Sequence, residues 1–196
     1  MLWNRGERGW VEVICGPMFS GKSEELIRRV TRSAIARLPV QVFKPALDNR
    51  YADREVVSHS SLSVAAQPVS TSDELLRAVD DATAVIGIDE GQFFDLGLVD
   101  VVERLAAAGK QVIVAGLDLD YLRRPFEPIP TLCGRAEYVT KALAVCHRCG
   151  GPALYTQRTV QSDELVVLGA VDSYEARCRE CYSSDEGHQE ALSIES

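Results

Sequence analysis

The chain has 196 residues, a formal net charge of −8 and 46% hydrophobic residues, which is enough apolar material for one sizeable core and a small appendage. No apolar run approaches the length of a membrane span, and residues 1–9 lack the apolar segment of a secretory signal, so we expect a cytoplasmic protein with no membrane partner. The acidic balance and the lack of a Lys/Arg-rich block argue against a surface for nucleic acid polymers.

Strand and helix patterns alternate along the first two thirds of the chain. Short apolar, β-branched runs predict strands, and apolar residues at helical spacing predict helices. In chain order we expect a strand over 10–15, a helix over 22–37, a strand over 40–43, a helix over 72–79, a strand over 83–88, a helix over 96–108 and a strand over 111–115. This alternation predicts an α/β fold with a parallel sheet, helices on both faces and right-handed crossovers.

The remaining stretches are less regular. Residues 48–67 show no clear period, although a short strand is expected within 64–69. Residues 117–130 are expected to be a loop because three prolines interrupt them, and 137–145 return to a strand pattern. The polar, acidic residues 183–196 predict a disordered tail.

A P-loop pattern, Gly-x4-Gly-Lys-Ser, lies between the first predicted strand and the first predicted helix. Its glycines let backbone N–H groups surround a phosphate, Lys22 brings an ammonium to the outer phosphates, and Ser23 offers a hydroxyl to Mg²⁺. The N-terminus of the following helix favours the anion as well. The expected ATP contacts of this loop are Gly16, Pro17, Met18, Phe19, Ser20, Gly21, Lys22 and Ser23.

An acidic pair, Asp89 and Glu90, follows the buried strand predicted over 83–88. The carboxyl edge of a parallel sheet is where ligands bind, so Asp89 is expected to hold Mg²⁺ near the P-loop. Glu90 can accept a proton from a hydroxyl nucleophile, which belongs to a substrate in a kinase and to water in an ATPase. Phe93 and Phe94 either stack on a base at this edge or pack in the core. The ATP-binding set is extended here by Asp89, Glu90, Gly91 and Gln92.

Two Cys-x-x-Cys pairs flank residues 150–177. Their four thiolates, from Cys146, Cys149, Cys178 and Cys181, predict a tetrahedral zinc site, which is structural because no coordination position stays open. Hairpin strands are expected within 154–157 and 165–168. Cys15 and Cys133 are expected to be small buried residues rather than ligands.

Taken together, these motifs resemble the zinc-containing cytosolic type of thymidine kinase. The resemblance rests on Gly16–Ser23, Asp89–Phe94, Ala115–Asp118 and the two cysteine pairs, and covers about residues 10–182. It implies a flexible N-terminus (1–9), a RecA-like P-loop domain (10–143), a zinc-binding lasso domain (144–182) and the tail (183–196). It also implies transfer of the ATP γ-phosphate to the 5′-hydroxyl of thymidine, with Glu90 as the general base.

The resemblance further implies a lasso that closes over the nucleoside and contacts the base through backbone groups. It assigns the lasso to Leu165, Val166, Val167, Leu168 and Gly169, with Tyr174 nearby. It assigns the pocket to Met18, Phe93, Leu117, Tyr121 and Phe126. It also implies a homotetramer that is inhibited by thymidine triphosphate.

Some points stay open at the level of the sequence. The family usually has an acidic residue after the histidine of the long loop, whereas Ser60 and Ser61 follow His59 here. Arg50, Arg123 and Arg124 are equal candidates for stabilising the transition state. The alternatives are a zinc-ribbon ATPase acting on nucleic acid, which the net charge disfavours, and a GTP-binding switch, which lacks its Asn-Lys-x-Asp motif.

Overall fold

The computed structural model describes residues 9–46, 55–57, 63–160 and 173–183, and its centre is a six-stranded parallel sheet. The strand order is β5-β2-β6-β7-β1-β8, and each neighbouring pair is parallel. The strands are β1 (Trp10–Cys15), β2 (Val40–Pro45), β5 (Gln67–Val69), β6 (Val85–Ile88), β7 (Gln111–Gly116) and β8 (Tyr138–Lys141). The predicted α/β class with a parallel sheet is confirmed.

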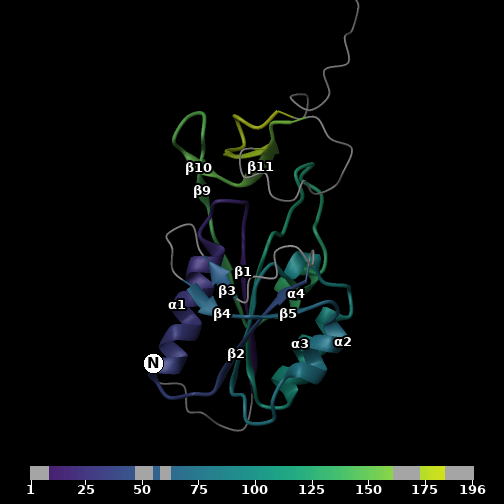
Figure 1. Ribbon diagram of the computed structural model, residues 1–196. Coiled ribbons are helices and arrows are strands. Elements are labelled where there is room, and N and C mark those ends of the chain that lie inside the picture. The colour runs from purple at the N-terminus through teal and green to yellow at the C-terminus, as the bar shows by residue number, and fades with distance from the viewer. Residues whose placement is uncertain (1–8, 47–54, 58–62, 161–172, 184–196) are drawn as a thin grey trace, which may run out of the picture.

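Helices cover both faces of this sheet (Figure 1). One face carries α1 (Lys22–Ile35), and the other carries α2 (Ser72–Ala78), α3 (Leu98–Ala107) and α4 (Ile129–Arg135). Among the described residues, no helix is both long and apolar enough to cross a lipid bilayer.

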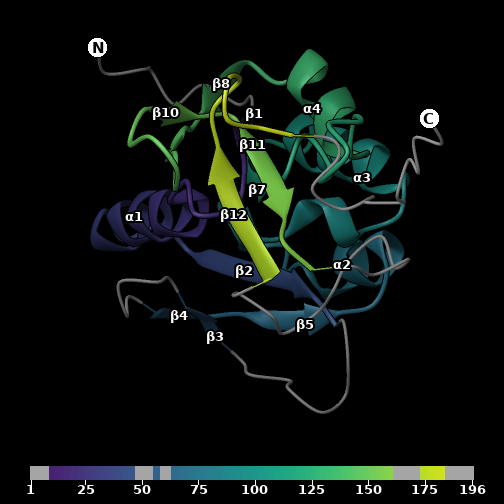
Figure 2. The same ribbon diagram turned by 90° about the horizontal axis from the view of Figure 1, so that it is seen from above.

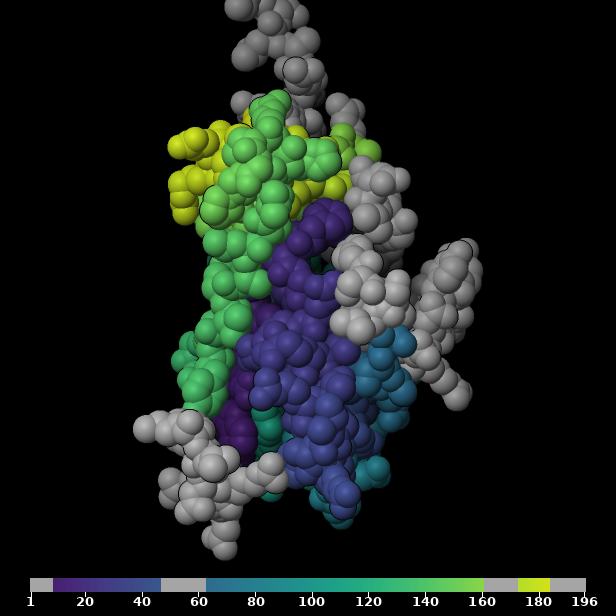
Figure 3. All heavy atoms as spheres, turned by 90° about the vertical axis from the view of Figure 1, so that its left-hand side faces the viewer, coloured from purple at the N-terminus to yellow at the C-terminus, as the bar shows by residue number. Residues whose placement is uncertain are grey.

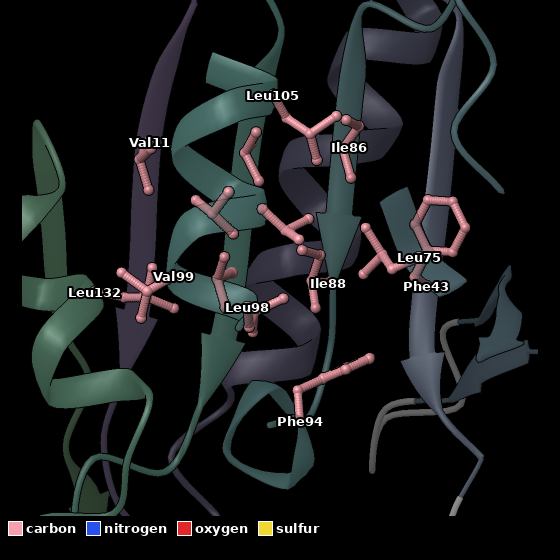
Figure 4. Close-up of a cluster of buried hydrophobic side chains, with 14 of the residues drawn as sticks. Val11, Phe43, Leu75, Ile86, Ile88, Phe94, Leu98, Val99, Leu105 and Leu132 are labelled. Carbon is pink, nitrogen blue, oxygen red and sulfur yellow. The ribbon is translucent and has the colours of Figure 1, made fainter. Parts of the chain in front are cut away.

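The alternation of side chains along β1 explains the two-faced core. Val11, Val13 and Cys15 point into the cluster under α2, α3 and α4, whereas Ile14 points into the cluster under α1. Figure 4 shows the first cluster, in which Ile86, Ile88 and Leu98 meet between the sheet and α3. Because the central strands β6 and β7 are buried on both faces, the apolar runs in the sequence mark them clearly.

An ion pair fixes α1 against the sheet. Arg29 donates from Nη1 to Glu12 Oε2 of β1 at 2.6 Å and from Nη2 to Thr140 Oγ1 of β8 at 2.8 Å. Glu25, one turn earlier, accepts from Arg29 Nε at 2.7 Å. These contacts set the direction in which the N-terminus of α1 points, which matters because the P-loop leads directly into that helix.

Two sequence predictions were wrong in detail. Residues 117–130 were expected to be a loop, but α4 begins at Ile129. Pro128 and Pro130 lie at the start of this helix, where proline is tolerated. The strand expected over 137–145 is divided into β8 and β9 (Ala144–Val145), since the chain leaves the parallel sheet after Lys141.

The irregular stretch 48–67 also contains more structure than its sequence indicates. The strands β3 (Glu55–Val57) and β4 (Ser63–Ala65) pair antiparallel, and three residues a strand are too few to show a period. The strand expected within 64–69 is present as β5. Of the flexible N-terminus predicted over 1–9 and the disordered tail predicted over 183–196, all residues but Gly9 and Ser183 lie outside the described part of the chain.

A small second unit sits at one end of the sheet (Figures 1 and 3). It contains β9, β10 (Pro152–Ala153), β11 (Tyr155–Arg158) and β12 (Tyr174–Arg177), in two antiparallel pairs. The strand expected within 154–157 is confirmed as β11, and its partner is β12. The other expected strand, 165–168, lies outside the described residues.

We predict that burial in the core cluster under α3 contributes strongly to stability. Leu98 is 0% exposed there, so Leu98→Ala should lower the free energy of unfolding by about 2–5 kcal/mol through lost burial and a cavity. Leu96, two residues earlier and 67% exposed, provides the matched control, and Leu96→Ala should change it by less than about 0.5 kcal/mol. Urea denaturation measures both, and equal losses would contradict the assigned core.

Candidate functional site

The P-loop connects β1 to α1 at the carboxyl edge of the sheet. Gly21, with φ of 77°, and Phe19, with φ of 65°, are left-handed, which turns the loop tightly before α1 begins at Lys22. Gly16 is required for a different reason: a Cβ there would lie 2.3 Å from the Ala142 carbonyl oxygen. The loop therefore has the curved backbone that an anion site needs.

Polar side chains of the loop are held by the loop itself. Lys22 Nζ donates to the Pro17 carbonyl at 2.7 Å, and Ser20 Oγ donates to the same oxygen at 2.8 Å. Burial lowers the pKa of the Lys22 ammonium, and the negative charges of Glu90 and Asp89 oppose that shift. Among the described residues, the hydrogen-bond partner of this half-buried ammonium is a neutral carbonyl, so the ammonium has a strong electrostatic preference for an anion such as phosphate.

Asp89 joins the P-loop to the end of β6. Ser23 Oγ donates to its carboxylate, at 2.9 Å from Oδ2 and 3.2 Å from Oδ1. Burial, together with the negative charge of Glu90, raises the pKa of the Asp89 carboxyl to about 7. A hydroxyl and a carboxylate at this spacing are oxygen ligands of the kind that Mg²⁺ prefers. The two residues predicted to hold Mg²⁺ are thus adjacent.

Glu90 is held in place by Gln92. Glu90 has a left-handed backbone, with φ of 51°, at the start of the short 3-10 helix η1 (Gly91–Phe93). Gln92 Nε2 donates to Glu90 Oε2 at 2.5 Å, and Gln92 Oε1 accepts from the Leu117 N–H at 2.9 Å. Since the buried Gln92 amide is occupied at both ends, the Glu90 carboxylate is directed by the position of β7.

The predicted pocket residues come from the P-loop, from η1 and from the loop after β7, and Tyr174 comes from β12. Phe93 of η1 and Phe126 meet edge to face, with ring centroids 6.0 Å apart. Phe94, in contrast, is buried in the core cluster under α3, so core packing is its role. Tyr121 and Tyr174 both contact Arg158.

Two residues of β11 reach this region without any signal in the sequence. Met18 of the P-loop donates its N–H to Thr156 Oγ1 at 3.0 Å, and Arg158 lies against Tyr121. Figure 2 shows β11 and β12 lying across the end of the sheet that carries the loops. No spacing rule relates residue 156 to residue 18, because their contact depends on how the small unit sits on the sheet.

Several predicted residues cannot be compared with the structure. The segment Leu165–Gly169, and with it Val166, Val167 and Leu168, lies outside the described residues, as do Arg50, His59, Ser60 and Ser61. Of the other arginine candidates, Arg123 places its guanidinium 5.2 Å from the Tyr155 ring centroid and 5.0 Å from that of Tyr182.

The four predicted cysteine ligands form a cluster that could hold a metal ion. The Sγ atoms of Cys146, Cys149, Cys178 and Cys181 all lie within 4.8 Å of one another, and those of Cys149 and Cys178 are 3.7 Å apart. A tetrahedral site with Zn–S bonds of about 2.3 Å requires sulfur atoms about 3.8 Å apart, so the arrangement fits zinc. Cys15 and Cys133 lie apart from it, against the core cluster under α3.

Comparison with known proteins agrees with the family resemblance of the sequence motifs. A family model described as "Thymidine kinase" matches residues 9–182. The chain is also 53% identical over 182 residues to a protein named "Thymidine kinase" from Rhodothermus sp. (strain ITI 518), and the aligned part covers 93% of this chain and 85% of that protein.

We predict that the cysteine cluster holds one metal ion and that each thiolate is needed. Cys178→Ser should lose most of the bound metal and lower the melting temperature, because three thiolates hold the ion much less tightly. Cys133→Ser is the matched control and should keep a full complement. Metal content by mass spectrometry of the purified proteins measures this, and a fully loaded Cys178→Ser variant would contradict the assignment.

The raised pKa of Asp89 predicts a pH dependence in the protein without nucleotide or Mg²⁺. The native carboxyl keeps its proton up to about pH 7, whereas the unfolded one releases it near pH 4. The native state therefore binds more protons between these values, and its free energy of unfolding should fall as the pH rises from about 4 to about 7, then stay level. Asp89→Asn should lack this component. Denaturation curves across that range measure the difference between the two proteins, and identical pH profiles would refute the prediction.

Proposed function

Because the chain belongs to the thymidine kinase family, we propose that it transfers the γ-phosphate of ATP to the 5′-hydroxyl of thymidine, giving thymidine monophosphate and ADP. The observation that carries this proposal is the bond from Ser23 of the P-loop to Asp89, which brings the phosphate cradle beside Glu90. A carboxylate at that position suits an acceptor with a hydroxyl group.

The P-loop and the acidic pair form the proposed ATP site. Backbone N–H groups of the loop surround the phosphates, except at Pro17, which has no N–H, and at Met18, whose N–H is bonded to Thr156 Oγ1. Lys22 exchanges its bond to the Pro17 carbonyl for one to a phosphate oxygen. Ser23 and Asp89 would hold Mg²⁺, which supplies positive charge to the β- and γ-phosphates when it is bound. Gly91 and Gln92 complete the edge of this site.

Glu90 is the proposed general base. It takes the proton of the 5′-hydroxyl as that oxygen attacks the γ-phosphorus, and the bond from this phosphorus to the bridging oxygen breaks as ADP leaves. The Gln92 amide aims the Glu90 carboxylate by a hydrogen bond of 2.5 Å. Most of the rate enhancement then comes from orientation and from charge neutralisation, since phosphoryl transfer needs little covalent help from the protein.

The nucleoside is proposed to lie between the core and the small unit. Met18, Phe93, Leu117, Tyr121 and Phe126 line the core side, and Tyr174 lines the other. The segment 165–169 is proposed as the lasso that closes over the base and excludes water, so that transfer to thymidine outcompetes hydrolysis. Residues 10–143 and 144–182 are proposed as the two domains.

Zinc is the proposed metal of the four-cysteine cluster, with a structural role. The thiolate set and its sulfur spacing favour zinc over the oxygen-preferring cations. Zinc here would fix β9, β10 and the end of β12, and therefore the two points from which residues 159–173 leave and return.

Family resemblance supports three further proposals. The protein is proposed to be a cytoplasmic homotetramer and to be inhibited by thymidine triphosphate. A nucleoside triphosphate of the product base has a physical reason to inhibit, since its base suits the nucleoside pocket and its phosphates suit the P-loop. The net charge of −8 and the family membership both favour this enzyme over an ATPase acting on nucleic acid.

We predict that Glu90→Gln lowers kcat for thymidine by about 10²–10⁴-fold, because the amide cannot take the proton, while ATP still binds. Glu103→Gln is the matched control, since that carboxylate only pairs with Arg135 on the outside of α3. ADP release with and without thymidine, and with a panel of nucleosides, measures both. Rapid ADP release by the wild-type protein without any nucleoside would contradict the proposed function.

A further inference from the structure

Reciprocal contacts between cationic and aromatic side chains join the core to the small unit. We call this set the clasp: Tyr121 and Arg123 from the loop after β7, and Tyr155, Arg158, Tyr174 and Tyr182 from the small unit. Each side offers an arginine to a ring of the other. Tyr182 also donates its hydroxyl to the Tyr121 carbonyl at 2.7 Å, and the Tyr155 and Tyr182 rings pack with centroids 5.3 Å apart.

Arg158 is the centre of one half of the clasp. Its Cζ lies 3.6 Å from the centroid of the Tyr121 ring, which is a close stack on the ring face. Its Nη2 donates to the Tyr174 hydroxyl at 3.0 Å, and the same guanidinium lies 5.5 Å from the Tyr174 ring centroid. Arg158 is 3% exposed and Tyr174 is 8% exposed, so these contacts are almost free of water.

The loop that carries Tyr121 is held rigid by hydrogen bonds within the loop itself. Asp120 Oδ1 accepts from the N–H groups of Leu122, at 2.9 Å, and Arg124, at 2.8 Å. Leu119 and Pro125 form an isolated β-bridge across the loop, and Arg123 between them is left-handed with φ of 62°. Tyr121 therefore cannot shift without moving the whole loop, including the approach to Phe126.

From this arrangement we propose that Arg158 is a positioning residue for the nucleoside: it sets the distance between Tyr121 on the core side of the pocket and Tyr174 on the other side. The inference rests on the proposed function, which places thymidine between the core and the small unit, with Tyr121 lining one side of the pocket and Tyr174 the other. It assigns to Arg158 a role in nucleoside binding that acts through its two aromatic neighbours and not through the phosphates.

The chemistry of the side chain explains why an arginine serves here. A planar guanidinium can stack on one ring and at the same time donate in its plane to a hydroxyl, and it is less strongly hydrated than an ammonium. A lysine has a compact charge that cannot do both, so Arg158→Lys keeps the charge and loses the geometry. Stacking and a buried hydrogen bond each contribute enough to change binding severalfold.

The test measures steady-state constants of the zinc-loaded full-length protein with thymidine and ATP. Arg158→Lys should raise KM for thymidine at least about tenfold, equivalent to about 1.4 kcal/mol, and leave KM for ATP within about twofold. Arg179→Lys is the matched control, because that exposed arginine of the small unit lies over a different ring, 5.5 Å from the Tyr155 centroid. It should leave both constants unchanged.

Tyr174→Phe provides a second variant, which breaks the same bond from the other side by removing the accepting hydroxyl while keeping the ring. It should raise KM for thymidine and leave KM for ATP unchanged. Because the two residues act as a unit, Tyr174→Phe should raise KM for thymidine less in the Arg158→Lys background than in the wild type. If Arg158→Lys fails to fold, Tyr174→Phe alone decides the question.

The outcomes separate three possibilities. A variant that is merely less stable has a lower apparent kcat with both KM values unchanged, and that result would overturn the inference, as would unchanged constants in Tyr174→Phe. If the wild-type protein phosphorylates thymidine and Arg158→Lys has the same KM for thymidine, the proposed function stands and the inference is refuted. Wild-type protein without thymidine-dependent turnover overturns both.

Discussion

The hydrogen bond between Ser23 and Asp89 is the contact on which the site depends. It joins the P-loop, which belongs to β1 and α1, to the end of β6, two strands away across the sheet. The P-loop follows the carboxyl end of β1 and Asp89 follows that of β6. Because both strands run parallel to β7, these two ends lie at the same edge of the sheet. Because Asp89 is buried, a carboxylate without this donor would be costly, and folding therefore brings the two groups together before any ligand arrives.

The same edge concentrates charge that water does not fully screen. Lys22 and Asp89 both have pKa values shifted by burial, in opposite directions, and each shift disfavours the charged form. A nucleotide phosphate with its cation would relieve both penalties, since it supplies an anion for the ammonium and a cation for the carboxylate. The cost of keeping these groups buried in the free protein is thus returned as binding energy, which is the expected use of local destabilisation at a functional site.

The sequence predicts most of the core and little of how the small unit meets it. The P-loop, Asp89 and the cysteine ligands follow from local spacing, and the parallel strands follow from runs such as Val85–Ile88 that are buried on both faces. The helix α4 was not predicted, because its prolines were interpreted as signals of a loop, although proline also suits the first turn of a helix. Thr156 and Arg158 carry no local signal, because they reach the site only through the pairing of β11 with β12 and the placement of that pair over the sheet.

The contact between Met18 and Thr156 shows why the two units act together. Met18 belongs to the P-loop, yet its N–H is bonded to a hydroxyl of β11 and is therefore not directed at a phosphate. One short backbone segment thus forms part of the phosphate cradle on one side and supports the small unit on the other. The clasp makes a second connection through the loop after β7. With two connections at separate points, the small unit cannot pivot about either one alone, so its position is fixed relative to both the phosphates and the pocket. A hydroxyl acceptor held between the units would consequently be aligned with the γ-phosphate by the fold itself, which is the condition that phosphoryl transfer requires most.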